Sequence, residues 1–431
     1  MALRVYRAGD TSHVSPMIRR LAVLLVAGLV AAAAVPAASQ ETPPDRFAGI
    51  RDLLARRSEA MLAGDEDAFM ATVDRGDPEF VKRQRLLFEG FRLIGLEDYR
   101  LDLTFEYWPE LTTDVEVDRY GEEAQPYVLH VEERYRLAGY DRQPALEDLF
   151  LTFVNRDGEW LVASDTDLDD LRMYSGRKLW EFGPVVIRES EHFLYVSPPE
   201  LGPRSDFILG AAERALDTLD QEWPEEWSRR VPIFVPETTA QLDRILQATF
   251  DLEVFVAFAY SGVDRARDWD LVGHRVILNW PNFSRNSEDF QQTILVHELL
   301  HVATREQSGP HTAVFVDEGV AELVSNDTDT YEITADLAAG RFDRALPRDY
   351  EFITGAQSDI IQSYQESYTA MRFATVNFGL DAVADFYRIL GEARLAPGTS
   401  RYHVGRAMEA TFGLSFPEFE EAWAEWAEDN L

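Results

Sequence analysis

The sequence predicts an α+β protein with two folded parts, the second of which ends in a helical half. Three observations support this class. Apolar side chains recur at helical spacing in residues 47–94, and runs of alternating polar and apolar residues follow as far as residue 163. From about residue 185, short strands alternate with helical segments. Beyond residue 286 nearly every segment has helical periodicity. Helices followed by strands, and a mixed sheet followed by helices, are arrangements of the α+β class.

The composition is that of a folded and strongly acidic protein. Of the 431 residues, 46% are hydrophobic and 12% aromatic, fractions that exclude a globally disordered chain. The formal net charge of −36 repels nucleic acid and anionic lipid. We therefore expect no nucleic acid partner, and no membrane contact beyond an N-terminal anchor. The chain has no cysteine, so thiol catalysis is excluded and only His, Asp and Glu remain to hold a metal ion.

The N-terminus has the pattern of a secretory signal. Arg19 and Arg20 precede an uncharged apolar run over 21–35, and the small residues 37–39 follow it. We expect residues 1–39 to be a signal peptide and the protein to be secreted or held in the cell envelope. An uncleaved N-terminal anchor stays open as the alternative, although the apolar run is short for a membrane-spanning helix.

After a polar linker at 40–46, a first domain is expected over residues 47–170. Helices are predicted over 47–62, 66–73 and 78–94, and strands over 99–107, 127–137, 149–155 and 159–163, with Arg156-Asp157-Gly158 as a hairpin turn. This order resembles the cone-shaped folds of the nuclear-transport-factor-like superfamily, in which helices pack into a curved sheet. The resemblance is one of architecture and carries no motif.

The acidic stretch Asp165–Asp170 follows this part. A calcium loop needs glycine at its sixth position and a carboxylate at its twelfth, and Asp170 and Gly176 occupy those positions here. The pattern therefore favours a solvated acidic linker.

The second domain is expected over residues 180–431. Its predicted strands are 185–188, 192–196, 231–235, 254–259 and 275–280, and its predicted helices are 204–221, 237–249, 287–306, 316–326, 358–378, 381–394, 401–412 and 416–428.

One of these helices carries the motif His297-Glu298-Leu299-Leu300-His301. Residues four apart on a helix lie on one face, so both imidazoles can reach one metal ion. Glu298 lies about 100° around the axis from His297, where it can meet a metal-bound water without ligating the ion. Ser287 is a suitable N-cap, and Glu288 and Asp289 suit the first turn.

A third ligand is expected from the next helix. Glu318 and Glu322 are again four residues apart, so both face the same way. One of them can ligate the ion while the other accepts the N–H of a ligand imidazole. The histidine-rich continuation of the metzincin class is absent, because Thr304 and Gln307 occupy the positions of its glycine and third histidine.

With these two motifs the chain resembles the gluzincin metallopeptidases, thermolysin-like or aminopeptidase-like, over about residues 185–431. The resemblance implies one zinc ion per chain bound by His297, His301 and Glu318, with Glu322 behind a ligand and Glu298 as the catalytic base. It also implies that a tyrosine polarises the scissile carbonyl, with Tyr364 as the match and Tyr368 as the alternative. The G-x-M-E-N segment by which aminopeptidases hold a free amine is absent, which favours endopeptidase action on a peptide or protein substrate.

Two other segments allow two interpretations each. Residues 275–280 precede the motif helix, where such enzymes pair substrate as an added edge strand, or they form an ordinary sheet strand. His311 lies between the two ligand helices and either stabilises transition-state charge or is a plain loop residue; we favour the loop residue. For the whole chain, the alternatives to a peptidase are a non-catalytic envelope protein and a binding module whose N-terminal part has the leading role.

Overall fold

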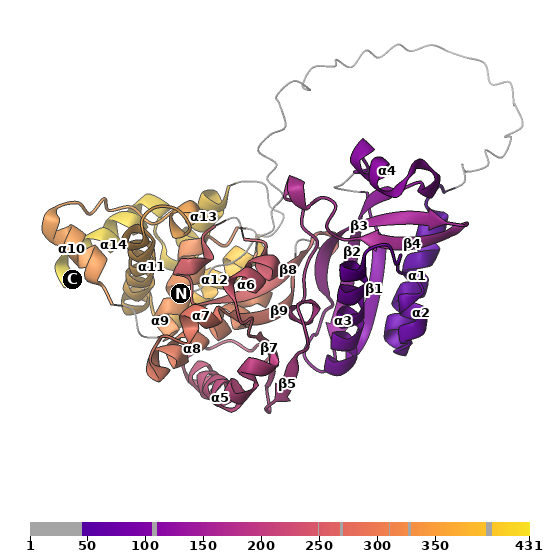
Figure 1. The fold of residues 1–431 in the computed structure, drawn as a ribbon. Coiled ribbons are helices and arrows are strands. Elements are labelled where there is room, and N and C mark those ends of the chain that lie inside the picture. Colours follow the sequence, from indigo (N-terminus) through magenta and orange to yellow (C-terminus); the bar gives the residue numbers. More distant parts are fainter. Residues whose placement is uncertain are drawn as a thin grey trace, which may run out of the picture.

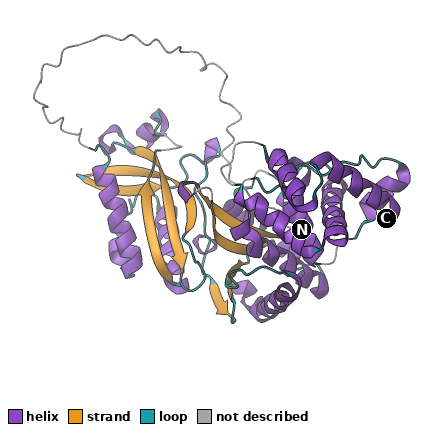
Figure 2. Cartoon of the chain, turned by 180° about the vertical axis from the view of Figure 1, so that it is seen from behind, coloured by secondary structure: helices purple, strands orange, loops and turns teal. Residues whose placement is uncertain are grey.

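The computed structural model describes residues 45–431 except 106–109, 249, 268–269, 310, 326–328 and 394–398. The predicted signal segment and most of the predicted linker lie outside the described residues. The described chain is an α+β structure with a curved antiparallel sheet, a mixed sheet and a helical C-terminal half (Figure 1), as the sequence predicts. Seen from behind, the strands occupy the left side and the middle of the molecule, and the end on the right, which carries the C-terminus, consists of helices (Figure 2). None of the described helices is long and apolar enough to cross a membrane.

The first sheet is a four-stranded antiparallel meander with helices packed against it. Its order is β1-β2-β3-β4, and Asp157 and Gly158 form the tight turn between β3 and β4 with φ values of 54° and 92°. Strand β1 ends earlier than predicted. The bounds are α1 Ala48–Ala63, α2 Glu66–Met70, α3 Pro78–Ile94, β1 Leu96–Leu103, α4 Asp114–Tyr120, β2 Tyr127–Leu137, β3 Ala145–Arg156 and β4 Glu159–Ser164.

Helix α4 is missing from the prediction although its signal is present. Thr113 and Glu116 form a capping box at its start. The Glu116 carboxylate accepts the backbone N–H of Thr113 at 2.7 Å, and the Thr113 hydroxyl accepts that of Val115 at 3.2 Å. This pattern is visible in the sequence.

The interior of the curved sheet is filled by the chain itself. The Lys178 ammonium lies against the Glu133 carboxylate, and the Tyr99 hydroxyl donates to the same carboxylate at 2.8 Å. Trp180 follows in a 3-10 turn and packs edge-on against Phe91 with ring centroids 5.0 Å apart. The space that remains among these groups is only about 20 Å³. This interior therefore has no room for an organic ligand.

The interpretation of residues 165–170 as a solvated linker is wrong. Asp165 is buried between Arg177 and Arg83, the latter at 2.8 Å. Asp167 accepts hydrogen bonds from Tyr120 at 2.8 Å and Thr152 at 2.6 Å. The acidic run lies between arginines of distant segments, and these partners cannot be read from the run itself.

The second sheet is mixed, with the order β5-β6-β7-β9-β8. Strands β6, β7 and β9 are parallel, and β5 and β8 pair antiparallel at the two edges. The bounds are β5 Val186–Glu189, β6 Phe193–Ser197, α5 Ser205–Glu222, β7 Val231–Phe234, α6 Thr239–Leu246, β8 Ala257–Asp264 and β9 Asp270–Leu278.

The topology decides between the two interpretations of residues 275–280. Strand β9 pairs with β7 at Val276 and Ile277 and with β8 along the same residues, so both of its edges are occupied. It is an ordinary interior strand, and the edge-strand hypothesis is wrong for it. Trp280 is not in the strand at all and begins a short helix. The edge of this sheet next to the motif helix is β8.

The C-terminal half consists of helices, of which α10 is missing from the prediction. Gln365 on α11 accepts from the backbone N–H groups of Glu332 at 2.8 Å and Ile333 at 3.1 Å. The first N–H of the helix, that of Tyr331, is accepted locally by Asp329 at 3.0 Å, so only part of the capping comes from a distant side chain. The bounds are α7 Trp280–Phe283, α8 Glu288–Thr304, α9 Val314–Ser325, α10 Tyr331–Ala339, α11 Gln357–Phe378, α12 Leu380–Glu392, α13 Ser400–Phe412 and α14 Phe416–Asn430.

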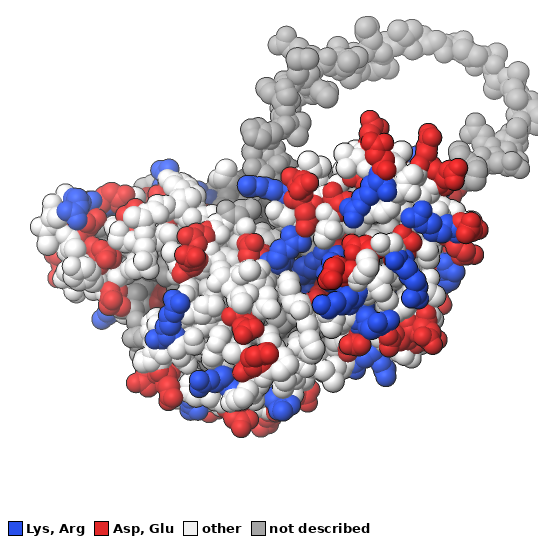
Figure 3. All heavy atoms as spheres, in the orientation of Figure 1, with Lys and Arg blue, Asp and Glu red and all other residues white. Residues whose placement is uncertain are grey.

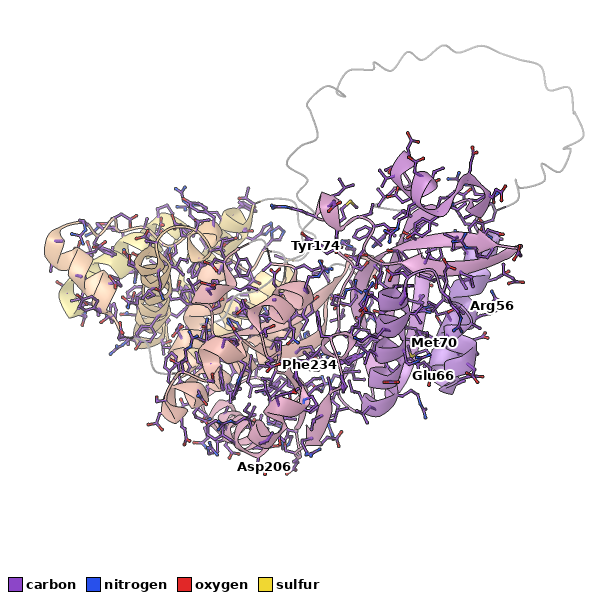
Figure 4. The ribbon with its side chains drawn as sticks, in the orientation of Figure 1. Arg56, Glu66, Met70, Tyr174, Asp206 and Phe234 are labelled. Carbon is purple, nitrogen blue, oxygen red and sulfur yellow. The ribbon has the colours of Figure 1, made fainter. Side chains whose placement is uncertain are left out.

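The two sheets meet across a packed junction. An added Cβ at Gly262 of β8 would lie 2.6 Å from the Leu146 carbonyl oxygen of β3, so the two backbones are in contact. Trp180 also packs edge-on against Phe234, which is labelled in Figure 4, with centroids 5.9 Å apart. Tyr174, labelled at the junction, lies under the Arg244 guanidinium at 4.9 Å (Figure 4).

Acidic and basic side chains are interspersed on the face shown in Figure 3. Basic groups gather mainly over the N-terminal part, and acidic groups lie beside them. This face has no basic stripe free of carboxylates.

Candidate metal centre

The motif helix α8 is central and buried. The Ser287 hydroxyl accepts from the backbone N–H of Phe290 at 3.3 Å, which confirms the predicted cap, and Glu288 and Asp289 lie in the first turn. From Ile294 to Thr304 every residue is buried. Helix α8 packs between the second sheet, α5 and α9, so its polar motif side chains lie inside the protein.

Helix α9 brings the two glutamates to the motif. Its Gly319 lies against α11, where an added Cβ would be 2.4 Å from the Ser367 carbonyl oxygen and 2.8 Å from the Met371 side chain. The glycine between the two acidic residues therefore allows α9 and α11 to approach closely. Glu318 of α9 and Tyr364 of α11 are both buried.

Three ligand atoms converge in this region. The His297 and His301 Nε2 atoms are 3.1 Å apart, and the Glu318 Oε2 atom is 3.2 Å from the first and 3.3 Å from the second. Zinc bonds of about 2.0–2.2 Å at tetrahedral angles separate their ligand atoms by about 3.3–3.5 Å. The triangle therefore fits one tetrahedral ion with a fourth position open. In the described part of the chain, these three residues form the one His/Asp/Glu group close enough to share an ion.

Each imidazole has a carboxylate behind it. The His297 Nδ1 atom is 3.5 Å from Glu322 Oε1, in the place predicted for Glu322. The His301 Nδ1 atom is 3.4 Å from Asp317 Oδ1, a residue that the sequence interpretation missed. A carboxylate at this nitrogen leaves the other ring nitrogen free to bind metal.

Asp317 is itself held in place from two further sides. The Arg305 guanidinium donates to its Oδ2 at 3.2 Å, and the Tyr387 hydroxyl donates to its Oδ1. Tyr387 also contacts the Thr304 hydroxyl at 3.1 Å. The position of Asp317 directly before Glu318 was visible in the sequence, but its partners come from α8 and α12.

The two imidazoles have opposite electrostatic environments in the absence of an ion. Burial lowers the pKa of His297 to about 4. Burial also disfavours the charged form of His301, but the carboxylates of Glu318 and Asp317 outweigh it and raise its pKa to about 10. His301 is thus the ring that a bound cation must deprotonate, so metal uptake releases a proton.

Glu298 is a fully buried carboxyl group whose oxygens accept no hydrogen bond from the described residues. The residue is 0% exposed. Burial raises the pKa of Glu298 to about 7, a value suited to a group that takes and returns a proton near neutral pH. A buried carboxyl without partners is costly for stability, which makes this position a candidate for chemistry.

The two candidate tyrosines have different surroundings. Burial raises the pKa of Tyr364 well above its ordinary value, and the carboxylates of Glu318, Glu322 and Glu298 add to the effect. Tyr368 accepts a hydrogen bond from Arg372 at 3.2 Å. The assignment of Tyr364 to the centre stays a prediction, with Tyr368 as the alternative.

His311, in the loop between α8 and α9, stacks on His403 of α13 with ring centroids 4.0 Å apart and planes inclined by 24°. This contact ties the loop to the C-terminal helices.

Comparison of the chain with models of known protein families and with curated proteins finds no match.

Proposed function

We propose that the protein is a secreted zinc endopeptidase. The observation that carries this proposal is the convergence of the His297, His301 and Glu318 ligand atoms beside the buried, unpartnered carboxyl of Glu298. Three protein ligands and an open fourth position are typical of catalytic zinc sites, whereas structural sites are closed by four. Secretion rests on the signal pattern of residues 1–39.

The roles of the residues follow from their positions. His297, His301 and Glu318 hold the ion, while Glu322 and Asp317 orient the two imidazoles. Zinc, when bound, supplies a Lewis acid that lowers the pKa of water and polarises a carbonyl oxygen.

The remaining chemistry belongs to the side chains. Glu298 accepts the proton of the attacking water and passes it to the leaving amine nitrogen, for which a pKa of about 7 is suited. Tyr364 donates its hydroxyl hydrogen bond to the oxygen that gains negative charge, because burial keeps this phenol protonated. Endopeptidase action is favoured over exopeptidase action because no segment of the sequence matches the amine-holding motif of related aminopeptidases.

Two other functions are less well supported. A binding module centred on the N-terminal sheet would need room inside that sheet, and Lys178, Glu133 and Trp180 occupy this space. A non-catalytic envelope protein would have no use for a buried Glu298 that satisfies no ligand and no hydrogen bond.

The decisive experiment is Glu298→Gln in the otherwise intact protein. Glutamine has nearly the shape of glutamate, so the variant should keep one zinc per chain and its melting temperature. Hydrolysis of casein or of quenched peptides should fall by about 10⁴-fold or more, since general acid–base groups contribute about 10²–10⁴ and this one acts twice per turnover.

The readouts are metal analysis, thermal unfolding and fluorescence assays on the parent and the variant. A variant that cleaves at a rate near that of the parent would remove Glu298 from the mechanism. A parent protein that binds zinc but cleaves nothing in a broad peptide library would favour the envelope role.

A further inference from the structure

A cavity of about 320 Å³ lies at the junction of the two sheets, apart from the metal centre. We call it the junction cavity. Its walls come from the loop between β2 and β3, the loop before β7, the start of β9 and the end of α8 with the 3-10 turn after it (Figure 1). A volume of this size is at the lower end for sites that bind small organic molecules.

Part of the wall of the junction cavity is apolar. Trp227 is 8% exposed, Val272 2% and Val302 5%, and all three line the cavity. Charged and polar side chains form most of the remaining wall. One of them, Arg305, is buried, and its charge is balanced by Asp317.

Two carboxylates of the junction cavity already have arginine partners. Asp141 is bound by Arg275, with one contact of 2.8 Å, and Glu306 by Arg142 at 3.1 Å. These acidic groups are therefore less able to repel an anion. The two guanidinium charges of Arg305 and Arg275 add to burial in lowering the pKa of His274, another lining residue, to about 3. The third lining carboxylate, Asp270, lies 3.8 Å from Arg267, so among the described residues Arg230 is the lining arginine without an ion pair.

Two polar groups lie together at the wall of the junction cavity. Arg230 forms no ion pair with any described residue, and its guanidinium lies 4.9 Å from the Tyr140 ring centroid. The Tyr140 side chain is 7% exposed, and its hydroxyl makes no hydrogen bond of ordinary length to a described residue. The Arg230 and Glu189 side chains are the polar groups that interact with this hydroxyl.

We propose that the junction cavity binds a small organic anion, whose carboxylate or phosphate group contacts Arg230 and the Tyr140 hydroxyl and whose apolar body lies against Trp227 and Val302. Guanidinium groups bind both kinds of oxyanion through paired N–H donors. Burial raises the pKa of Tyr140, and the neighbouring Glu189 carboxylate adds to this; Glu189 opposes an anion at this position. The proposal is independent of peptidase activity.

The test is isothermal titration calorimetry on the purified zinc-loaded protein at constant ionic strength. Benzoate and phenyl phosphate serve as probes, with benzyl alcohol as the neutral control and inorganic phosphate as the control without an apolar body. We expect both aromatic anions to bind at one site, more tightly than either control, and their relative affinities tell whether carboxylate or phosphate is preferred.

Variants locate the site. Arg230→Gln should weaken binding by about tenfold or more, as loss of a charged hydrogen bond does, and Tyr140→Phe by less. Glu189→Gln should tighten binding. The matched control is Arg229→Gln, because Arg229 is the adjacent arginine, is paired with Asp220 and does not line the junction cavity.

The proposal is overturned if neither aromatic anion binds, or if Arg230→Gln binds them like the parent, as anions held by zinc would. It is also overturned if inorganic phosphate binds as tightly as phenyl phosphate, since the apolar walls then contribute nothing.

Discussion

At the scale of single residues, the candidate centre is defined by what surrounds each polar group. His297 and His301 belong to one helix face, yet burial lowers the pKa of one and two carboxylates raise that of the other. On His301 the charge of Glu318 has the larger effect and that of Asp317, which lies 3.4 Å from its Nδ1, adds to it. The Asp317 carboxylate, Arg305 and Tyr387 form a buried network beside this candidate metal ligand.

Replacing Asp317 with asparagine tests this network. The variant should bind zinc about 10–100-fold more weakly, as other partners of metal ligands do when lost. It should also unfold more easily, since Arg305 loses its buried counter-charge. Competition with a zinc-binding dye measures the affinity. Tyr387→Phe is the control, because it removes one hydrogen bond and keeps the carboxylate. Equal zinc affinity in Asp317→Asn and the parent would exclude Asp317 as an orienting group.

Removing the Tyr364 hydroxyl tests the oxyanion role. We expect Tyr364→Phe to lower kcat by about 10²–10³ with KM and zinc content nearly unchanged, as loss of one oxyanion donor does. Tyr368→Phe is the matched control, and it should stay near the parent rate because its hydroxyl contacts Arg372. A large loss in the control with full activity in Tyr364→Phe would transfer the role one helical turn along.

At the scale of secondary-structure elements, the centre depends on how closely α8, α9 and α11 pack. Helix α8 supplies both imidazoles, α9 supplies the glutamates and Asp317, and α11 supplies Tyr364. The spacing between α9 and α11 is set at Gly319, whose Cα faces the α11 backbone at Ser367. Any side chain at this position must separate the two helices.

Gly319→Ala compares two opposing effects on stability, the close packing of α9 against α11 and the higher helix propensity of alanine. Alanine favours a helix over glycine by about 1 kcal/mol, whereas overpacking a core costs about 1–3 kcal/mol or more. The added Cβ would meet backbone at 2.4 Å, so we expect net destabilisation and weaker zinc binding. Gly210→Ala in α5 is the matched control: its nearest neighbour is the flexible Arg214 side chain at 3.5 Å, and the variant should be slightly stabilised. Denaturant unfolding gives both values, and a stabilised Gly319→Ala would disprove the close contact.

At the scale of the whole molecule, several buried carboxylates are paired with basic groups although the chain has a net charge of −36. Buried carboxylates such as Asp165 and Glu133 lie against Arg177 and Lys178, and these pairs join segments far apart in the chain. Glu366 of α11 has no such basic partner among the described residues: burial raises its pKa to about 8, and the 2.8 Å hydrogen bond from Gln362 offsets only part of this rise.

Glu366 therefore predicts a pH dependence of stability. Its pKa in the folded state, about 8, is above its ordinary value of 4.5, so the folded protein binds the proton more tightly than the unfolded chain. The contribution of Glu366 to the free energy of unfolding is fully present below pH 4.5 and is lost as pH rises through 8. At about 1.4 kcal/mol per pKa unit, the loss amounts to a few kcal/mol. Glu366→Gln should flatten the fall in melting temperature between pH 5 and 8. The exposed Glu425→Gln should leave the fall as it is, and an unchanged slope in Glu366→Gln would disprove the assignment.

Local patterns were sufficient for much of this molecule. Helix α3, strand β2 and the α8 cap have the predicted bounds or partners, because periodicity, caps and turn residues act within a few positions. Helical spacing likewise places His297 and His301 on one face of α8, and Glu318 and Glu322 on one face of α9. That the two faces meet is a tertiary contact.

Contacts between distant segments decided the rest. Gln365 completes the cap of α10, Arg83 lies against Asp165 of the acidic run, and β9 is interior because β7 and β8 both pair with it. The contact of Asp317 with His301 and the junction cavity also depend on which elements meet. So do the different surroundings of Tyr364 and Tyr368. The sequence by itself determined the α+β class and the metal-ligand motifs, because these follow from local periodicity. The tertiary structure alone decided how each charge is neutralised, because that depends on partners far along the chain.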